Sequence, residues 1–262
     1  MSLPLLTGCV SQAAAGGGAA VTAAENLVHW WKMSEGSTTA ETDYGLAATS
    51  ETNMVLSGVT SSSGGPAENG TPSMVEFDGV ADSGYVLAVN GSGANTAMGD
   101  LLDSSPNSWS FSLWLKDEST SNSTYKTWWK AGSTWSDGFG VYAVSPDRQF
   151  YWLSIYNGYK AVVNTAVPTS GWRNIIVTFP DTTSSAGYMK VYFDGTEVGS
   201  YGAFSGISTA IGTTANTRLS FGCAIAPNGT ANYHQACAMS DIRMYNKVLS
   251  GAEITAIAAG DW

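Results

Sequence analysis

Aromatic side chains beside carboxylates and amides are the residues of this sequence best suited to chemistry, and that chemistry is sugar recognition. The chain contains ten tryptophans and twelve tyrosines. A flat ring packs on the apolar face of a pyranose, while carboxylates and amides bind its hydroxyl groups. The candidates for a carbohydrate-binding patch are two neighbouring rings and three residues in or beside polar turns, namely Trp128, Trp129, Trp135, Asp137 and Tyr159.

These rings have a structural alternative, because tryptophan and tyrosine are also enriched at subunit interfaces and fill the cores of sandwiches. Trp128 and Trp129 are adjacent, as are Trp30 and Trp31. Successive side chains of a strand point to opposite faces, so we expect only one ring of each pair to face inward. The sequence leaves both interpretations open, a sugar-binding patch or aromatic packing.

The sequence shows none of the residue arrangements that are typical of catalysis. Its two histidines, His29 and His234, are far apart, and no Ser-His-Asp or Cys-His arrangement follows from them. It contains no phosphate loop, no dinucleotide fingerprint and no His/Cys cluster with metal-ligand spacing. We therefore expect a protein that is not an enzyme.

The charge of the chain argues against two classes of partner. The formal net charge is −10, and charged residues make up only 12% of the chain. A nucleic-acid surface needs clustered lysine and arginine, which this sequence lacks. No apolar stretch approaches the roughly 20 residues that span a bilayer. We expect neither a nucleic-acid partner nor a membrane span.

The elements that would position the candidate residues are short strands, and the last of them runs into a helix. Ser250 and Glu253 form a Ser-x-x-Glu capping box, which predicts a short helix with Ile254 and Ile257 on its apolar side. Alternation before it predicts a strand with two faces, one formed by Met239, Asp241, Arg243 and Tyr245 and the other by Ser240, Ile242 and Met244.

Gly, Ser, Thr and Asn separate aromatic-rich runs along the whole chain, which is typical of an all-β protein with many turns. All-β sandwiches of 262 residues are commonly single domains. We expect one domain over residues 27–262, preceded by a Gly/Ala-rich arm over residues 1–26 that serves as an anchor or interface.

Seven segments in order resemble the motifs of the laminin G-like, concanavalin A-like jelly-roll family. They include a first strand with an Asp-x-Gly turn, a strand pair around an Asp-Gly turn and the strand-to-helix signature at the end, and they span 27–33, 43–45, 75–79, 109–116, 171–179, 189–198 and 240–254. The resemblance implies an all-β, antiparallel two-sheet jelly-roll sandwich with a short C-terminal helix. It leaves function open, because lectins, adhesion modules, enzymes and virion proteins share this fold.

The resemblance carries two expectations about carboxylates. Glucanases of this fold use a Glu-x-Asp-x-x-Glu pattern, whose carboxylates must lie about 5 Å apart across the bond to be cleaved. Glu41-Thr42-Asp43 begins this pattern, but Leu46 replaces the second Glu. Related domains also often hold a structural calcium ion, for which Asp43 and Asp241 are the candidate ligands. The alternative for Asp43 is a turn in which it bonds its own backbone.

The cysteines leave two alternatives. Cys223 and Cys237 flank the turn signal Pro227-Asn228-Gly229. If strands over 219–225 and 235–245 pair across it, the two thiols face each other and form a disulfide in an oxidising compartment. The other alternative is two half-buried thiols in a reduced protein.

Two functions fit this sequence. The first is a non-enzymatic virion-surface protein, of the phage capsid decoration or fibre type, that binds host glycans. In this setting the arm contacts other virion subunits, the protein forms a homo-oligomer, and it is made in the host cytoplasm. A start at Met1 without a signal peptide favours this interpretation. The second is a bacterial extracellular carbohydrate-binding or adhesion module.

Overall fold

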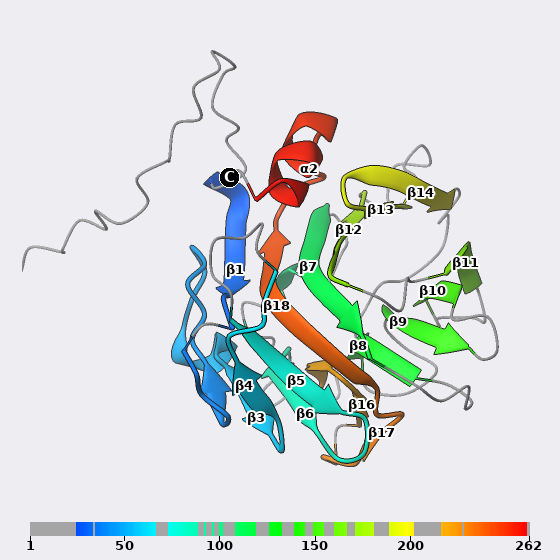
Figure 1. The fold of residues 1–262 in the computed structure, drawn as a ribbon. Helices are drawn as coiled ribbons and strands as arrows, with labels where there is room; N and C mark the ends of the chain where they lie inside the picture. The colour runs from blue at the N-terminus through cyan, green and yellow to red at the C-terminus, as the bar shows by residue number, and fades with distance from the viewer. Residues whose placement is uncertain are drawn as a thin grey trace, which may run out of the picture.

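A computed structural model shows an antiparallel two-sheet sandwich with one short C-terminal helix, which confirms the expected fold class (Figure 1). The structure describes residues 25–33, 35–66, 73–88, 92, 96, 100–101, 108–118, 126–132, 139–144, 149–154, 160–166, 171–180, 189–201, 216–226 and 228–260. Within these ranges, no helix is both long and apolar enough to cross a membrane.

Sheet A has the strand order β14-β13-β12-β7-β18-β5-β4, and β1 joins it by pairing with β18. Its strands are β1 (Leu27–Trp31), β4 (Thr60–Ser62), β5 (Met74–Asp78), β7 (Trp109–Asp117), β12 (Arg173–Phe179), β13 (Met189–Phe193), β14 (Thr196–Tyr201) and β18 (Ala236–Tyr245).

Sheet B has the order β11-β10-β9-β8-β15-β6-β3-β2. Its strands are β2 (Ala40–Glu41), β3 (Met54–Ser57), β6 (Ser83–Leu87), β8 (Lys126–Gly132), β9 (Phe139–Val144), β10 (Gln149–Ser154), β11 (Lys160–Ala166) and β15 (Arg218–Phe221). A separate small hairpin consists of β16 (Ala224–Ile225) and β17 (Ala231–Asn232), and a 3-10 turn, η2, spans Ser50–Thr52.

The main core lies between the two sheets, where aromatic rings from both inner faces meet. Phe111 of β7 lies 4.4 Å from Trp129 of β8, measured between ring centroids, and so joins sheet A to sheet B. Trp109 stacks on Phe179 of the neighbouring β12 at 5.0 Å. Aromatic packing of this kind contributes both buried area and a preferred ring geometry.

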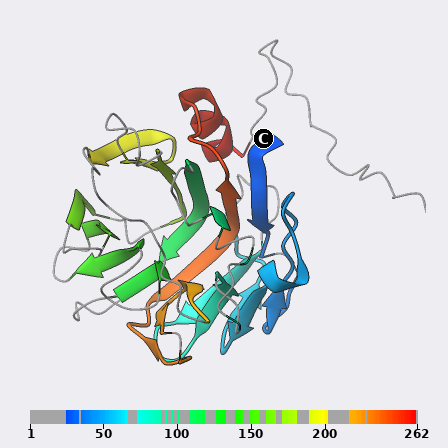
Figure 2. The ribbon, with the colours of Figure 1, turned by 180° about the vertical axis from the view of Figure 1, so that it is seen from behind.

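A second apolar cluster lies on the outer face of sheet A, under the helix α2 (Gly251–Ala258). The helix begins at the expected capping box, in which the Ser250 N–H donates to Glu253 Oε2 at 2.8 Å. Ile254 and Ile257 pack against Tyr245 of β18 and Ile176 of β12. The two views show α2 beside β1 at this edge of the molecule (Figures 1 and 2).

The strand β18 has a β-bulge that the sequence pattern did not predict. Its register against β7 shifts between Ser240 and Arg243, and Asp241 has a φ of +51°. The extra residue changes the phase of the alternation, so Met239 joins Ile242 in the main core instead of sharing a face with Asp241. The expected placement of Met239 was therefore wrong, although the strand itself is confirmed.

The pairing that would bring Cys223 and Cys237 together does not form. Cys223 follows β15, which pairs with β6 and β8 in sheet B, whereas Cys237 lies in β18 of sheet A. Both cysteines are buried, and burial raises the pKa of the Cys223 thiol to about 12. A thiol with such a pKa is a poor nucleophile near neutral pH, because the thiolate is the reactive form.

Candidate functional site

The structure places two of the five predicted sugar-binding residues in the core. Trp128 and Trp129 of β8 are each 1% exposed. Both rings face inward because the register of β8 against β9 shifts between Thr127 and Trp129, which breaks the strict alternation. Neither ring presents a face to solvent, so our prediction for these two residues is corrected. Trp135, Asp137 and Tyr159 lie outside the described residues.

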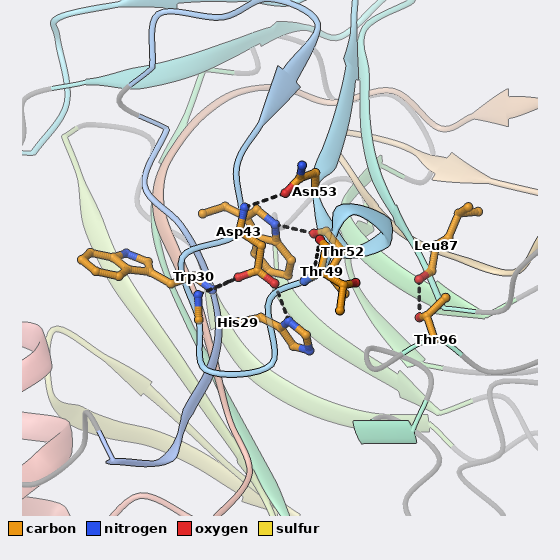
Figure 3. Close-up of polar contacts among 10 residues, drawn as sticks. His29, Trp30, Asp43, Thr49, Thr52, Asn53, Leu87 and Thr96 are labelled. Carbon is orange, nitrogen blue, oxygen red and sulfur yellow. Dashed lines mark hydrogen bonds and ion pairs between the residues drawn. The ribbon is translucent and has the colours of Figure 1, made fainter. Parts of the chain in front are cut away.

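The predicted calcium ligand Asp43 holds a chain segment against β1 (Figure 3). Its Oδ2 accepts a hydrogen bond from His29 Nδ1 at 2.7 Å. Its Oδ1 accepts the backbone N–H groups of Trp30 at 2.8 Å and Gly45 at 2.9 Å. Burial raises the pKa of Asp43, but the bonds from His29 and Trp30 outweigh it and leave the pKa below its usual value. Because this carboxylate only accepts, Nδ1 of His29 carries the proton.

Asp241 reaches the same tryptophan from the other side of β1. The left-handed backbone at the bulge turns its carboxylate toward Trp30, whose Nε1–H donates to Oδ1 at 2.7 Å. Arg243 donates from Nε to Oδ1 at 2.8 Å, and its Nη2 lies 2.6 Å from Oδ2. The ion pair is almost fully buried and fixes the indole in one orientation.

These surroundings do not fit a calcium ion at Asp43 and Asp241. Calcium is bound by six to eight oxygen ligands that are free of competing donors. Here both oxygens of Asp43 and Oδ1 of Asp241 already accept N–H groups, and Oδ2 of Asp241 is in an ion pair with Arg243, which supplies the positive charge. Among the described residues, no group of three or more His, Cys, Asp or Glu has the geometry to hold a metal ion.

The two carboxylates of the partial glucanase pattern are buried in the protein interior. Glu41 is fully buried, and neither of its oxygens has a hydrogen-bond partner. Burial raises its pKa to about 7, with the charge of Glu35 adding to the effect. Asp43, two residues away, is also buried and already bonded to His29. This pair therefore has no surface on which a glycosidic bond can lie.

An aromatic surface forms where β1 lies between β18 and the segment that follows Asp43. Trp30, Lys32 and Tyr44 form this surface, which we call the Trp30 platform. The rings of Trp30 and Tyr44 meet at 6.2 Å and 65°. Lys32 Nζ lies 4.2 Å from the Trp30 ring centroid and 4.3 Å from that of Tyr44. Tyr44 is 46% exposed, and its hydroxyl donates to Glu35 Oε1 at 2.5 Å.

Cross-strand pairing brings the platform residues together. Trp30 pairs with Arg243 of β18 on one side, and Tyr44 N–H donates to Trp30 O at 2.8 Å on the other. The inward side of β1 carries His29 and Trp31, which leaves Trp30 on the outer side. The alternation of side chains in the sequence separates Trp30 from Trp31, but it does not indicate Tyr44, which lies in a segment that the sequence predicts only as a turn. An isolated antiparallel bridge between Trp31 and Asp43 places Tyr44 beside Trp30, and the sequence has no local pattern that indicates this bridge.

Residues 89–255 match the family model of the concanavalin A-like lectin/glucanases superfamily, a span of more than half of the chain. A comparison with curated proteins found no match.

Solved structures resemble the chain in fold, at 13–15% sequence identity. The binding domain of botulinum neurotoxin serotype D matches with a TM-score of 0.63 at 13% identity, over 91% of this chain and 53% of that one. Domain 4 of AbnA, an extracellular arabinanase from Geobacillus stearothermophilus, in complex with arabinotriose, matches at 0.59 and 15%, over 89% and 98%. Trypanosoma rangeli sialidase in complex with sialic acid matches at 0.60 and 14%, over 90% of this chain; the chain spans only 33% of that protein.

Proposed function

The chain belongs to the concanavalin A-like lectin/glucanases superfamily, and from this premise we propose that it is a carbohydrate-binding module that contacts sugars through the Trp30 platform. The observation that carries the proposal is the platform itself, an exposed Tyr44 ring held against Trp30 beside the charged groups of Lys32 and Glu35. Stacking on an aromatic face combined with directed polar contacts is the physical requirement for binding a pyranose or furanose ring.

The pre-organisation of the platform supports this function. Trp30 is fixed by the bond to Asp241, and Tyr44 by the bond to Glu35 and by the backbone contact to β1. Rings that are held in place before binding lose little conformational entropy when a ligand arrives. A solvent-exposed ring that merely covered the core would not need these polar restraints.

We also propose that the module is not an enzyme. Glu41 and Asp43, the carboxylates that begin the glucanase pattern, face the interior, and Leu46 stands in place of the third carboxylate. Retaining glycosidases need two accessible carboxyl groups that flank the scissile bond. Structures of a sialidase and of an arabinanase domain resemble this chain in fold, but a shared fold does not imply a shared activity. The proposal therefore rests on the residues of this chain.

The setting of the module is a separate proposal with two alternatives. A virion-surface role, as a phage capsid decoration or fibre subunit, rests on the Gly/Ala-rich arm over residues 1–26 and on the low content of charged residues. A bacterial extracellular carbohydrate-binding or adhesion role gains support from the fold shared with a toxin binding domain and with a domain of an extracellular arabinanase. Sedimentation of the native source material separates them, because only a virion subunit travels with nucleic-acid-containing particles.

Calorimetric titration with oligosaccharides tests the binding proposal. Arabinotriose and a panel of other tri- and tetrasaccharides serve as probes. We expect Tyr44→Ala to weaken binding roughly tenfold, because loss of a stacking ring at the centre of a contact surface costs about 1.4 kcal/mol or more. Trp30→Phe keeps a ring but removes the bond to Asp241, and we expect a smaller loss.

Val80→Ala is the matched control, because Val80 is 75% exposed in the turn between β5 and β6, away from the platform. Melting curves of each variant establish that it folds. The wild-type chain binding none of the saccharides would overturn the function. Binding that survives Tyr44→Ala unchanged would overturn the choice of site.

A further inference from the structure

We propose that the Trp30 platform selects neutral saccharides, with adjacent sugar hydroxyls bound by Lys32 as donor and Glu35 as acceptor, and that it rejects anionic saccharides. This inference rests on the proposed function and adds the chemical class of the ligand. It follows from the hydrogen-bonding state and the charge of the groups around Tyr44.

Lys32 supplies unused donors. Most of the described basic side chains pair with carboxylates: Lys116 with Glu118, Lys190 with Glu197, Lys247 with Glu253, Arg173 with Asp194 and Arg243 with Asp241. The ammonium of Lys32 differs, because within the described part of the chain it contacts two aromatic rings and makes no hydrogen bond or ion pair. An ammonium group carries three donors, and all of them remain available to a ligand.

Glu35 supplies an ionised acceptor at a fixed position. Its Oε1 accepts the Tyr44 hydroxyl at 2.5 Å, and its Oε2 accepts the Thr42 N–H at 3.3 Å. Partial burial raises the pKa of Glu35, but the bonds from Tyr44 and Thr42 and the charge of Lys32 lower it below its usual value overall. Each oxygen of a carboxylate has two lone-pair sites, so each retains one for a sugar hydroxyl.

Tyr44 is the more exposed of the two aromatic residues of the platform. Lys32 and Arg243 both lie over the ring of Trp30, at 4.2 Å and 5.3 Å from its centroid. Trp30 is also partly packed against the cluster under α2. Lys32 Nζ also lies over the Tyr44 ring, at 4.3 Å from its centroid. Tyr44 is nevertheless 46% exposed, so a sugar packed against the exposed part of the ring lies beside both Lys32 and the Glu35 carboxylate that accepts the Tyr44 hydroxyl. A donor and an acceptor side by side match two neighbouring hydroxyls, one of which accepts and one of which donates.

The balance of charge decides against an anionic ligand. At the platform the charge of Lys32 is offset by that of Glu35, and Arg243 is paired with Asp241. The chain as a whole carries −10. A carboxylated or sulfated sugar would be repelled by the Glu35 carboxylate and by the negative long-range potential, whereas a neutral sugar donates a hydroxyl to Glu35 and is repelled by neither. We therefore expect the platform to bind uncharged saccharides through their hydroxyl groups and to bind anionic saccharides more weakly.

A titration with matched ligands tests the inference. Each neutral oligosaccharide is compared with a uronic-acid counterpart and a sulfated counterpart of equal length. We expect the neutral ligand to bind roughly tenfold more tightly than either. We also expect its Kd to change little between about 50 and 500 mM NaCl, because an uncharged ligand has no net attraction to screen.

Two isosteric or near-isosteric variants separate the roles of the polar groups. Glu35→Gln keeps the shape of the side chain and removes its charge, so we expect weaker binding of neutral sugars and a smaller discrimination against anionic ones. Lys32→Met keeps the aliphatic stem and removes the donors, so we expect weaker neutral binding with the discrimination retained. Tighter wild-type binding of an anionic sugar, or unchanged discrimination in Glu35→Gln, would overturn this inference alone. Absence of binding to every class would overturn the proposed function and this inference with it.

Discussion

Two carboxylates of one short segment show how strongly partners determine the state of a buried residue. Asp43 accepts three N–H groups and is held below its usual pKa. Glu41, two residues earlier and also fully buried, has no hydrogen bond to either oxygen. The nearby backbone N–H groups of Glu35 and Met33 do not meet hydrogen-bond geometry and lower its pKa only slightly, so the loss of hydration dominates and the pKa rises to about 7. The same segment thus contains one satisfied and one destabilising carboxylate.

This difference predicts how the stability of the protein depends on pH. The pKa of Glu41 rises from 4.5 to about 7 on folding, so the folded state binds a proton that the unfolded state has released between these values. Stability therefore falls as pH rises from about 4.5 to 7, by roughly 3 kcal/mol from this residue. We expect Glu41→Gln to match the wild type at pH 5 and to exceed its free energy of unfolding at pH 8.

Urea denaturation at both pH values measures this effect. Glu25→Gln is the control, because Glu25 is an exposed glutamate and its replacement should leave the pH dependence of the wild type in place. If Glu41→Gln and the wild type lose stability in parallel between pH 5 and pH 8, the destabilising charge lies elsewhere.

At the scale of elements, the platform depends on how closely the segment after Asp43 approaches β1. A Cβ atom on Gly45 would lie 2.1 Å from Val28 O and 2.4 Å from the Cα of His29. No flexible side chain can give way there, because both neighbouring atoms belong to the backbone. We expect Gly45→Ala to separate the segment from β1 and to destabilise the protein by about 2–3 kcal/mol, as overpacking does.

Denaturation with urea measures the loss, and sugar titration reports the displacement of Tyr44. Gly251→Ala is the matched control: a Cβ there meets nothing within 4 Å, and Gly251 is the first residue of α2, where Ala favours the helix. Equal stability of the two variants would show that the contact between Gly45 and β1 is not needed.

The elements also mark the limit of what the sequence predicts. The strand β18 and the Ser250–Glu253 capping box are predicted by local patterns, and both appear in the structure. The bulges at Asp241 and Trp128 are not local: they depend on the register of a partner strand distant in sequence. The burial of Trp128 and the left-handed backbone of Asp241 follow from these bulges. A strict two-residue period therefore predicts the strands but not every residue on their faces.

The candidate site was predictable only in part for the same reason. The sequence indicated aromatic sugar recognition and the importance of Asp43, but the platform joins Trp30 of β1 with Tyr44 and is braced by Asp241 of β18. The hydrogen bond between Trp30 and Asp241 spans 211 positions. No local pattern encodes such a contact, because only the pairing of β1 with the last strand creates it.

At the scale of the whole molecule, the platform is formed where the first strand, β1, pairs with the last strand, β18. The first and last strands pair side by side, and α2 covers their outer face next to the platform (Figures 1 and 2). Contacts of such high sequence separation form only after much of the chain is ordered. Binding by the platform is therefore coupled to the integrity of the complete sandwich, and a ligand that binds only the folded state raises its stability.

The same linkage gives a sharp test of calcium binding to the whole molecule. A site with a Kd of about 1 μM would stabilise the folded state by about 4 kcal/mol at 1 mM calcium. For a domain of this size, that would raise the melting temperature by roughly 8 °C or more. Because every oxygen of Asp43 and Asp241 already accepts an N–H group or is paired with Arg243, we expect no such shift. Calorimetric melts after dialysis against EDTA, then with calcium or magnesium restored, measure it. A rise with calcium but not with magnesium would mean that oxygen atoms elsewhere in the chain hold the ion and that the fold depends on it.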